Sequence, residues 1–170
     1  MTYSMHQAFA PITKTMLTSL SEVLAKGAAF AEAKKIEPSV LLGWRLTPDM
    51  FPLTRQVQIA TDGARGGAAR LAGMEMPSVP DEEKTFDELH ARIKSTIAYI
   101  DSIPAAKIDG SEGKTIVLKM RSGERTFTGQ SFLMGFVLPN LMFHCTTAYN
   151  LLRMNGVEVG KRDFLGTFQG

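Results

Sequence analysis

The chain has 170 residues, a length that fits one domain with a sizeable core and predicts a single domain over residues 1–170. Its formal net charge is only +2, with basic and acidic residues interspersed, so no basic stripe indicates a nucleic-acid partner. A single cysteine, Cys145, excludes an internal disulfide framework and a zinc site of four thiolates.

The chain starts without the basic end and apolar segment of a secretory signal, which predicts a cytoplasmic protein. Apolar residues then recur at steps of three and four and predict a helix over residues 4–26, bent near its start by Pro11. The alanine-rich residues 27–35 predict a short further helix. Residues 40–46, which hold the only tryptophan, predict a helical turn packed against the other helices.

A second long helix is predicted to begin at Phe51-Pro52, since proline is tolerated in a first turn, and to end within residues 73–80. Its inner face consists of Leu53, Val57, Ala60, Ala64, Ala68 and Leu71. These small residues indicate close approach by a neighbouring helix. Thr85 followed by Glu88 is a capping-box pattern, so a third helix should begin there and stop at Pro104.

Residues 115–120 alternate in polarity and residues 125–128 can return as a second strand after a Ser122-Gly123 turn, which predicts a β-hairpin. A lone hairpin is marginally stable, so we expect it to lie against the helices. A fourth helix is predicted from residue 129 to residue 155, and its polar seam favours a buried helix over a membrane span. The tail, with Val159, Phe164 and Phe168, should pack. The fold predicted is all-α, an up-down four-helix bundle with a short β-hairpin between its third and fourth helices.

Three segments carry a family resemblance, residues 49–62, 147–153 and 155–166. They closely resemble a bacterial family of unknown function, the one numbered nineteen ninety-three in the domain-of-unknown-function series. That family resembles a branch of the DinB/YfiT-like superfamily, and the match covers almost the whole chain. The resemblance implies a four-helix bundle, often dimeric and often metal-binding, with relatives that are thiol-dependent transferases or isomerases.

The superfamily's metal site consists of three histidines. One lies in the second helix in a His-Ile-Ala pattern, and two lie in the fourth as His-x-x-x-His, ahead of an Arg-x-x-Gly helix ending. In this sequence the matching positions hold Gln58, Asn140 and His144, followed by Arg153 and Gly156. The spacing is kept, but carboxamides replace two of the three imidazoles.

Positions 140 and 144 share one helix face, and a residue of the facing second helix can converge with them. Zinc and nickel prefer imidazole, thiolate or carboxylate, so this is a weak ligand set unless Asp62, one turn from Gln58, adds a carboxylate. The alternative is a trio of polar side chains that satisfy one another by hydrogen bonds. The candidate ligand-binding residues are therefore Gln58, Asp62, Asn140 and His144, with His144 as the candidate metal ligand.

Two functions follow from this pattern. The first is a module that binds a small molecule or a partner without catalysis, a metal or another cofactor, in which the metal centre has degenerated. The second is a metal-dependent enzyme of the thiol-transferase or hydrolase kind, with His144 as the surviving ligand to zinc or nickel. A homodimer is expected, because one bundle cannot bury every face of the fourth helix; the alternative is that the hairpin and the tail cover the remaining faces within one chain. Its apolar residues off the inner seam are Phe132, Phe136, Met142 and Phe143.

Overall fold

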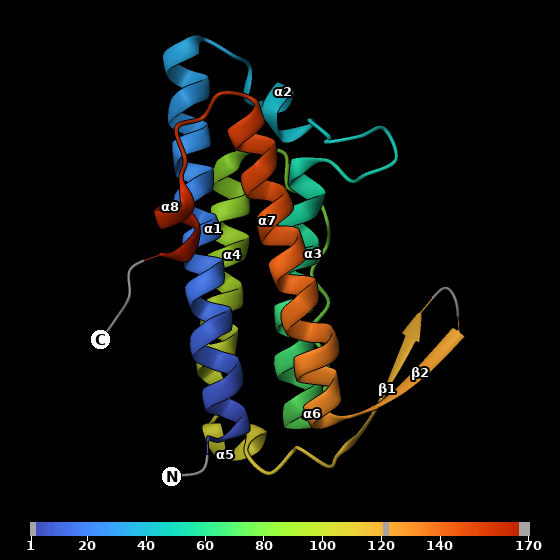
Figure 1. Cartoon of the computed structure of the whole chain (residues 1–170). Coiled ribbons are helices and arrows are strands. Elements are labelled where there is room, and N and C mark those ends of the chain that lie inside the picture. The colour runs from blue at the N-terminus through green and yellow to red at the C-terminus, as the bar shows by residue number, and fades with distance from the viewer. Residues whose placement is uncertain (1–2, 121–122, 167–170) are drawn as a thin grey trace.

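The computed structural model describes residues 3–120 and 123–166 of the chain (Figure 1). These residues are mostly helical, with one small antiparallel sheet, as predicted. The long helices are α1 (Met5–Lys34), α3 (Leu53–Ala72), α4 (Phe86–Ser102) and α7 (Leu138–Met154). The short elements are α2 (Pro38–Leu42), α5 (Ala105–Ile108), β1 (Thr115–Met120), β2 (Gly123–Thr128), α6 (Gly129–Phe132), the π-helical segment η1 (Leu133–Val137) and α8 (Lys161–Leu165).

Helix α1 is one continuous helix of 30 residues, rather than the two helices predicted over residues 4–26 and 27–35. Gly27 lies inside this helix and lets α7 approach closely, since an added Cβ there would lie 2.9 Å from a methyl group of Leu152. Pro11 lies inside this helix and has no N–H to donate to the carbonyl of Gln7. The hydroxyl of Tyr3 donates to that carbonyl instead, at 3.0 Å, so the proline leaves no acceptor unused.

The long helices do not alternate in direction as the predicted up-down arrangement requires. Helices α3 and α4 run in the same direction, as two hydrogen bonds between them show. Arg92 donates to Thr61 at 2.8 Å and, one turn further along both helices, Arg65 donates to Thr96 at 2.6 Å. Helices α1 and α7 run in the opposite direction (Figure 1). The connection over residues 73–84 permits this, since an extended segment of that length reaches about 40 Å and α3 is about 30 Å long.

The segment from α6 to α7 was predicted as one regular helix, but it contains a π turn between these two helices. The amide of Leu138 donates to the carbonyl of Leu133, five residues back, just before Pro139. Proline has no N–H to donate to the preceding turn, so the regular pattern is interrupted here. No helix within the described residues is long and apolar enough to cross a membrane.

The hairpin forms as predicted, with Ile116 paired opposite Phe127, but only its base contacts the helices. The Phe127 ring centre lies 5.8 Å from that of Phe132 and 6.0 Å from that of Phe136. Beyond this aromatic cluster the strands project away from the bundle (Figure 1). Ser122 of the predicted turn lies outside the described residues.

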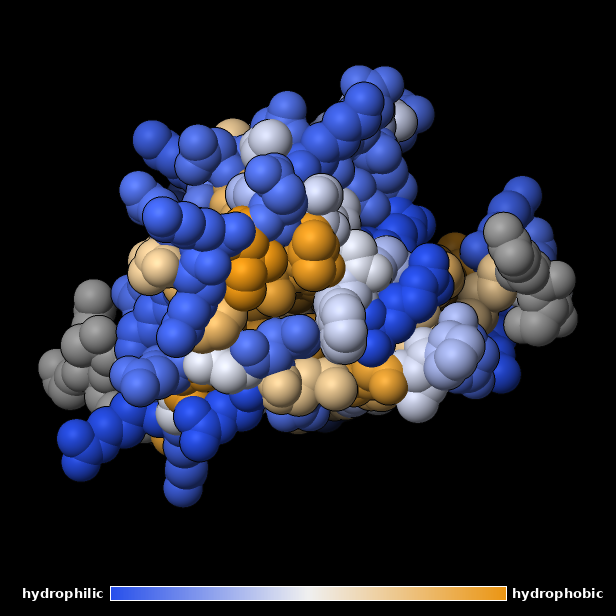
Figure 2. All heavy atoms as spheres, turned by 90° about the horizontal axis from the view of Figure 1, so that it is seen from above, coloured by the Kyte–Doolittle hydropathy of each residue, from blue (hydrophilic) through white to orange (hydrophobic). Residues whose placement is uncertain are grey.

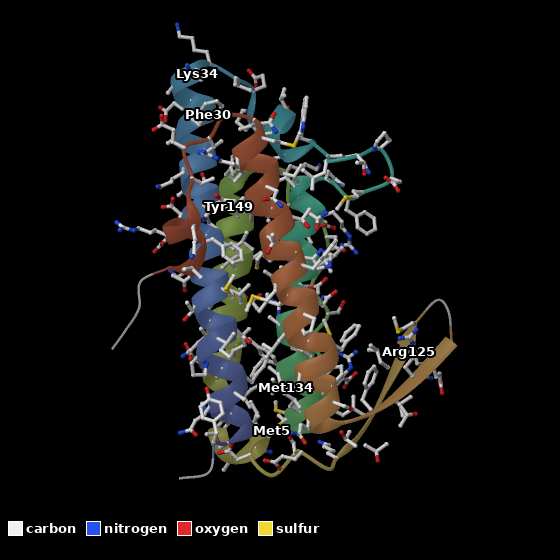
Figure 3. The ribbon with its side chains drawn as sticks, in the orientation of Figure 1. Met5, Phe30, Lys34, Arg125, Met134 and Tyr149 are labelled. Carbon is white, nitrogen blue, oxygen red and sulfur yellow. The ribbon has the colours of Figure 1, made fainter. Side chains whose placement is uncertain are left out.

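The tail packs along α1 and α7, as the sequence predicts. Val159 is buried, and the ring of Phe164 meets edge-on, at 5.9 Å, that of Tyr149, which Figure 3 labels on α7. Lys26 forms an ion pair with Asp163 at 2.7 Å. Phe168, which was expected to pack as well, lies outside the described residues.

The end of the bundle near α2 carries apolar side chains among hydrophilic ones, as Figure 2 shows from above. Helix α2 packs there through Leu41 and Leu42, each 3% exposed. The predicted packing of this turn is therefore confirmed, but Trp44 just beyond it is 42% exposed.

Candidate functional site

Helices α3 and α7 are in direct contact along a seam of small residues, as the inner face of the second predicted helix indicates. At Gly67 an added Cβ would lie 2.8 Å from a methyl group of Val137. At Gly63 it would lie 3.0 Å from the side-chain nitrogen of Asn140. The half-buried Asn140 therefore faces α3 across a close contact with Gly63.

One turn along this seam, His144 forms a hydrogen bond with Gln56 of α3. The Nδ1 atom of His144 lies 2.7 Å from Oε1 of Gln56, and both residues are buried. The Nε2 group of Gln56 donates to the carbonyl of Phe51 at 3.0 Å, so the oxygen of this amide is the atom that faces the ring. Because an amide oxygen only accepts, Nδ1 of His144 carries the proton.

The environment of His144 opposes a positive charge. Burial, and then the charge of Arg55, lowers the pKa of His144 to about 4, so the ring is neutral at neutral pH. The same positive charge opposes a divalent cation beside the ring. The neighbouring Cys145 is also uncharged, since burial raises the pKa of its thiol to about 12.

Gln58 is buried but points away from His144. Its Nε2 group donates to Glu83 at 2.8 Å, and its Oε1 atom accepts from Arg55 at 3.2 Å. The hydrogen-bonded trio expected from the sequence does not form: His144 pairs with Gln56 rather than Gln58, and it makes no hydrogen bond with Asn140 among the described residues.

Arg92 of α4 is the centre of an ion-pair cluster with three carboxylates. Its Nη2 atom lies 2.6 Å from Asp62 and 3.0 Å from Asp81, and its Nη1 atom lies 2.8 Å from Glu83. Asp62, expected as an additional ligand beside His144, is thus paired with Arg92. The side chain of Arg92 is 1% exposed, so these carboxylates neutralise a buried cation.

The two carboxylates closest to Arg92 respond differently to burial. For Asp62, burial is the largest influence and the pKa lies above its usual value, although the charge and the hydrogen bond of Arg92 lower it. For Glu83, burial also acts to raise the pKa, but hydrogen bonds from Arg92 and Gln58 outweigh it and hold the pKa below its usual value. Glu83 is therefore the firmly ionised partner of Arg92.

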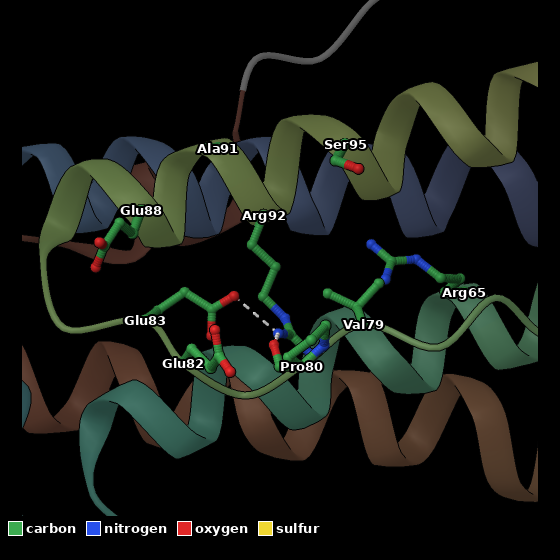
Figure 4. A pocket seen from close by; sticks show the side chains of 9 residues that line it. All are labelled: Arg65, Val79, Pro80, Glu82, Glu83, Glu88, Ala91, Arg92 and Ser95. Atoms are coloured by element: carbon green, nitrogen blue, oxygen red, sulfur yellow. Dashed lines mark hydrogen bonds and ion pairs between the residues drawn. The ribbon is translucent and has the colours of Figure 1, made fainter.

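A cavity of about 380 Å³ lies beside this cluster (Figure 4). Its lining residues are Arg65, Val79, Pro80, Glu82, Glu83, Glu88, Ala91, Arg92 and Ser95. Arg65 is 2% exposed, and its Nη2 group donates to Thr96. Among the described residues, its Nη1 group has no hydrogen-bond partner.

A family described as a domain of unknown function, DUF1993, matches residues 5–165. The chain belongs to the DUF1993 family. It is also similar to the crystal structure of a DinB family member protein from Shewanella denitrificans, with 41% identity and a TM-score of 0.88 over 96% of this chain and 92% of that one. No curated protein matches the chain. The family resemblance predicted from the three sequence segments is confirmed.

In this DUF1993 chain the four predicted ligand residues lie in two separate groups: Asn140 and His144 face the seam, while Gln58 and Asp62 face the Arg92 cluster. Within the described part of the chain, no group of three or more His, Cys, Asp and Glu side chains could hold a metal ion. A ligand-binding role for these residues stays a prediction.

Sequence reasoning missed the two buried arginines of this family member. A signal was present, because Thr61 and Arg65 in α3, like Arg92 and Thr96 in α4, are spaced four apart and share a helix face. The spacing alone could not show that each threonine accepts from the arginine of the other helix, since that depends on the two helices running in parallel.

Proposed function

We propose that this DUF1993 protein is a DinB-like bundle that binds a small molecule or a partner without a catalytic metal centre. The observation that carries the proposal is the hydrogen bond from His144 to Gln56, which lies beside the positive charge of Arg55. An imidazole that pairs with a neutral carboxamide and lies beside a positive charge disfavours the binding of zinc or nickel.

The carboxylates of Asp62 and Glu83 do not add ligands to this set. Asp62 and Glu83 are paired with Arg92, and moving either toward His144 would take one of the three carboxylates away from a buried guanidinium. The second function, a metal-dependent enzyme built on His144, would require that rearrangement.

The first test is metal binding by protein purified without an affinity tag. Zinc or nickel at a hundred times its dissociation constant would stabilise a specific binder by about 2.7 kcal/mol. We expect no stoichiometric metal and an almost unchanged melting temperature after either metal is added. Tight binding that is lost in His144→Ala or Asp62→Ala would contradict the proposal and favour the enzyme.

Adding imidazoles should create metal binding only when the new histidine on α3 replaces Gln56 rather than Gln58. The double variant Gln56→His with Asn140→His places three imidazoles along the α3–α7 seam, so we expect a metal-dependent rise in melting temperature. The matched control is Gln58→His with Asn140→His, in which the new imidazole on α3 faces Glu83 and Arg55. Equal metal responses from both variants would show that the seam is not the metal position.

We also propose a homodimer, which covers apolar side chains that the chain leaves exposed between α6 and the end of α7. The chain itself covers part of the segment from α6 to α7: Phe132 is buried, and Phe136 and Met142 are half-buried. Phe143 remains 55% exposed and Met134 57% exposed. A second copy that packs against Phe143 would bury it, as an isologous interface repeats one apolar surface on each protomer.

Sedimentation velocity at micromolar concentration tests this association. We expect a dimer, which Phe143→Glu converts to a monomer because it places a charge within the interface. Val40→Glu is the control, since Val40 is 49% exposed near α2, at the other end of the bundle. A monomeric parent protein would contradict the proposal.

A further inference from the structure

Arg65 stands out because it is a buried cation without an anion. Its side chain is among the most completely buried in the described residues, and its only hydrogen bond is the one to the neutral hydroxyl of Thr96. No carboxylate of the described residues lies within ion-pair distance of it, whereas Arg92 has three. An unpaired guanidinium away from water is costly, so its persistence calls for a partner.

The unpartnered Nη1 group belongs to a side chain that lines the cavity between α4 and residues 79–83. Figure 4 shows the Arg65 guanidinium directed into the space between Ser95 and Val79. The hydroxyl of Tyr99, one turn along α4 from Ser95, is a second buried group without a hydrogen-bond partner among the described residues. The Nη1 atom itself has almost no exposed surface, so a ligand in this cavity reaches it only where the lining side chains move aside. An acceptor placed there would satisfy the guanidinium.

We propose that this cavity binds a small monocarboxylate whose carboxylate accepts hydrogen bonds from Arg65. The guanidinium has donors in a planar fork that matches the two oxygens of a carboxylate. Burial and the charge of Arg92 lower the pKa of Arg65 by more than the charges of Asp62, Tyr99 and Glu83 raise it, and an anion in the cavity would favour the charged form further.

The rest of the cavity selects a single negative charge on a small body. Val79, Pro80 and Ala91 offer apolar contacts, and the volume of about 380 Å³ suits a compact ligand. Glu82 and Glu88 line the exposed side, so a second negative charge would meet like charges. This arrangement disfavours phosphate and dicarboxylates.

The inference rests on the proposed function, because it supplies the small molecule for a protein that binds without a metal. The site does not include His144. A failure here would leave the metal experiments unaffected, and a metal bound at His144 would not by itself fill this cavity.

The test compares propionate with its neutral analogue propionamide and with phosphate, at equal ionic strength in chloride buffer. At a hundred times its dissociation constant, propionate should raise the melting temperature by roughly 5 to 10 °C, as expected for a chain of this size. Propionamide should cause no comparable rise, because it carries no charge for Arg65 to bind. Phosphate should be much weaker than propionate.

Three variants locate the effect. Arg65→Met should abolish the rise caused by propionate. Arg70→Met should keep it: the substitution removes the same charge from the same helix, but the Arg70 side chain donates to the carbonyl of Gly66 outside the cavity. Ala91→Leu should also abolish the rise by filling the cavity from the exposed face of α4, with Arg65 intact. It serves as the blocking variant should Arg65→Met fold poorly.

Several results would overturn the proposal. A rise of equal size with propionamide, or one retained in both Arg65→Met and Ala91→Leu, would show that the carboxylate does not bind at Arg65. A response to phosphate alone would show that the ligand class is wrong. No response to propionate would mean that an ordered water molecule is all that Arg65 requires.

Discussion

The variant Arg92→Met is expected to lower the free energy of unfolding by about 3 kcal/mol, because three carboxylates lose the buried cation that pairs with them. Glu83, whose side chain is 12% exposed, carries most of this loss. Asp62 and Asp81 are 30% and 38% exposed and regain water, which places the effect at the low end of the range for a broken buried pair. Urea denaturation monitored by circular dichroism measures the change.

Arg65→Met is the matched comparison, since it removes an equally buried guanidinium from the facing helix. No carboxylate of the described residues pairs with Arg65, so methionine removes a desolvated charge and retains most of the packing. In chloride buffer without carboxylates, we expect its free energy of unfolding to be unchanged or higher than that of the parent. Similar losses from both variants would show that the three carboxylates are not the reason Arg92 matters.

Local sequence signals predicted the helix boundaries well where a specific side chain makes the boundary. Thr85 and Glu88 form the predicted capping box, with Thr85 accepting from the amide of Glu88. Helix α3 ends at Gly73 in a left-handed conformation, within the predicted range. These contacts involve residues three or four apart, so the sequence contains all of their partners.

The direction of α4 could not be predicted in the same way. Residues 73–84 were interpreted as the end of one helix and a connection to the next, and composition does not show whether such a segment turns back or runs the length of the bundle. The direction depends on what the segment packs against, here the carbonyl of Pro80 and the carboxylate of Glu83, both bound by Arg92.

The choice of Gln58 over Gln56 has a related physical cause. The family pattern aligned Gln58 with a ligand position, but two residues along a helix rotate a side chain by about 200°, onto nearly the opposite face. Gln56 therefore faces His144 across the α3–α7 seam, while Gln58 faces the Arg92 cluster. The sequence predicted that a buried amide would satisfy His144, and the structure corrects which amide it is.

Stability should fall as the pH is lowered from 6.5 to 4, because His144 takes up a proton in the unfolded chain before it does so in the folded one. Its pKa falls from an ordinary 6.5 to about 4 on folding, through burial and the charge of Arg55. A group whose folded pKa is depressed contributes stability that is present above its unfolded pKa and lost as the pH falls through the folded pKa. The expected loss across this window is about 3 kcal/mol.

Two carboxylates also affect how the free energy of unfolding changes at acidic pH. The depressed pKa of Glu83 adds a further loss at lower pH, as its ion pair with Arg92 is protonated. The raised pKa of Asp62 acts in the opposite direction, since its charged form is the one that burial penalises. Neither carboxylate changes in a His144 variant, so the difference between variant and parent isolates the imidazole.

The variant His144→Gln provides that difference, because it keeps a polar partner for Gln56 but cannot titrate. We expect its free energy of unfolding to lose about 3 kcal/mol less than the parent's between pH 6.5 and 4. The control His6→Gln changes a histidine at the start of α1, outside the α3–α7 seam, so the comparison tests whether the effect belongs to His144. A parent slope that survives in His144→Gln would mean that the ring is not held neutral by the α3–α7 seam, and the hydrogen bond to Gln56 would no longer explain why this position disfavours a metal ion.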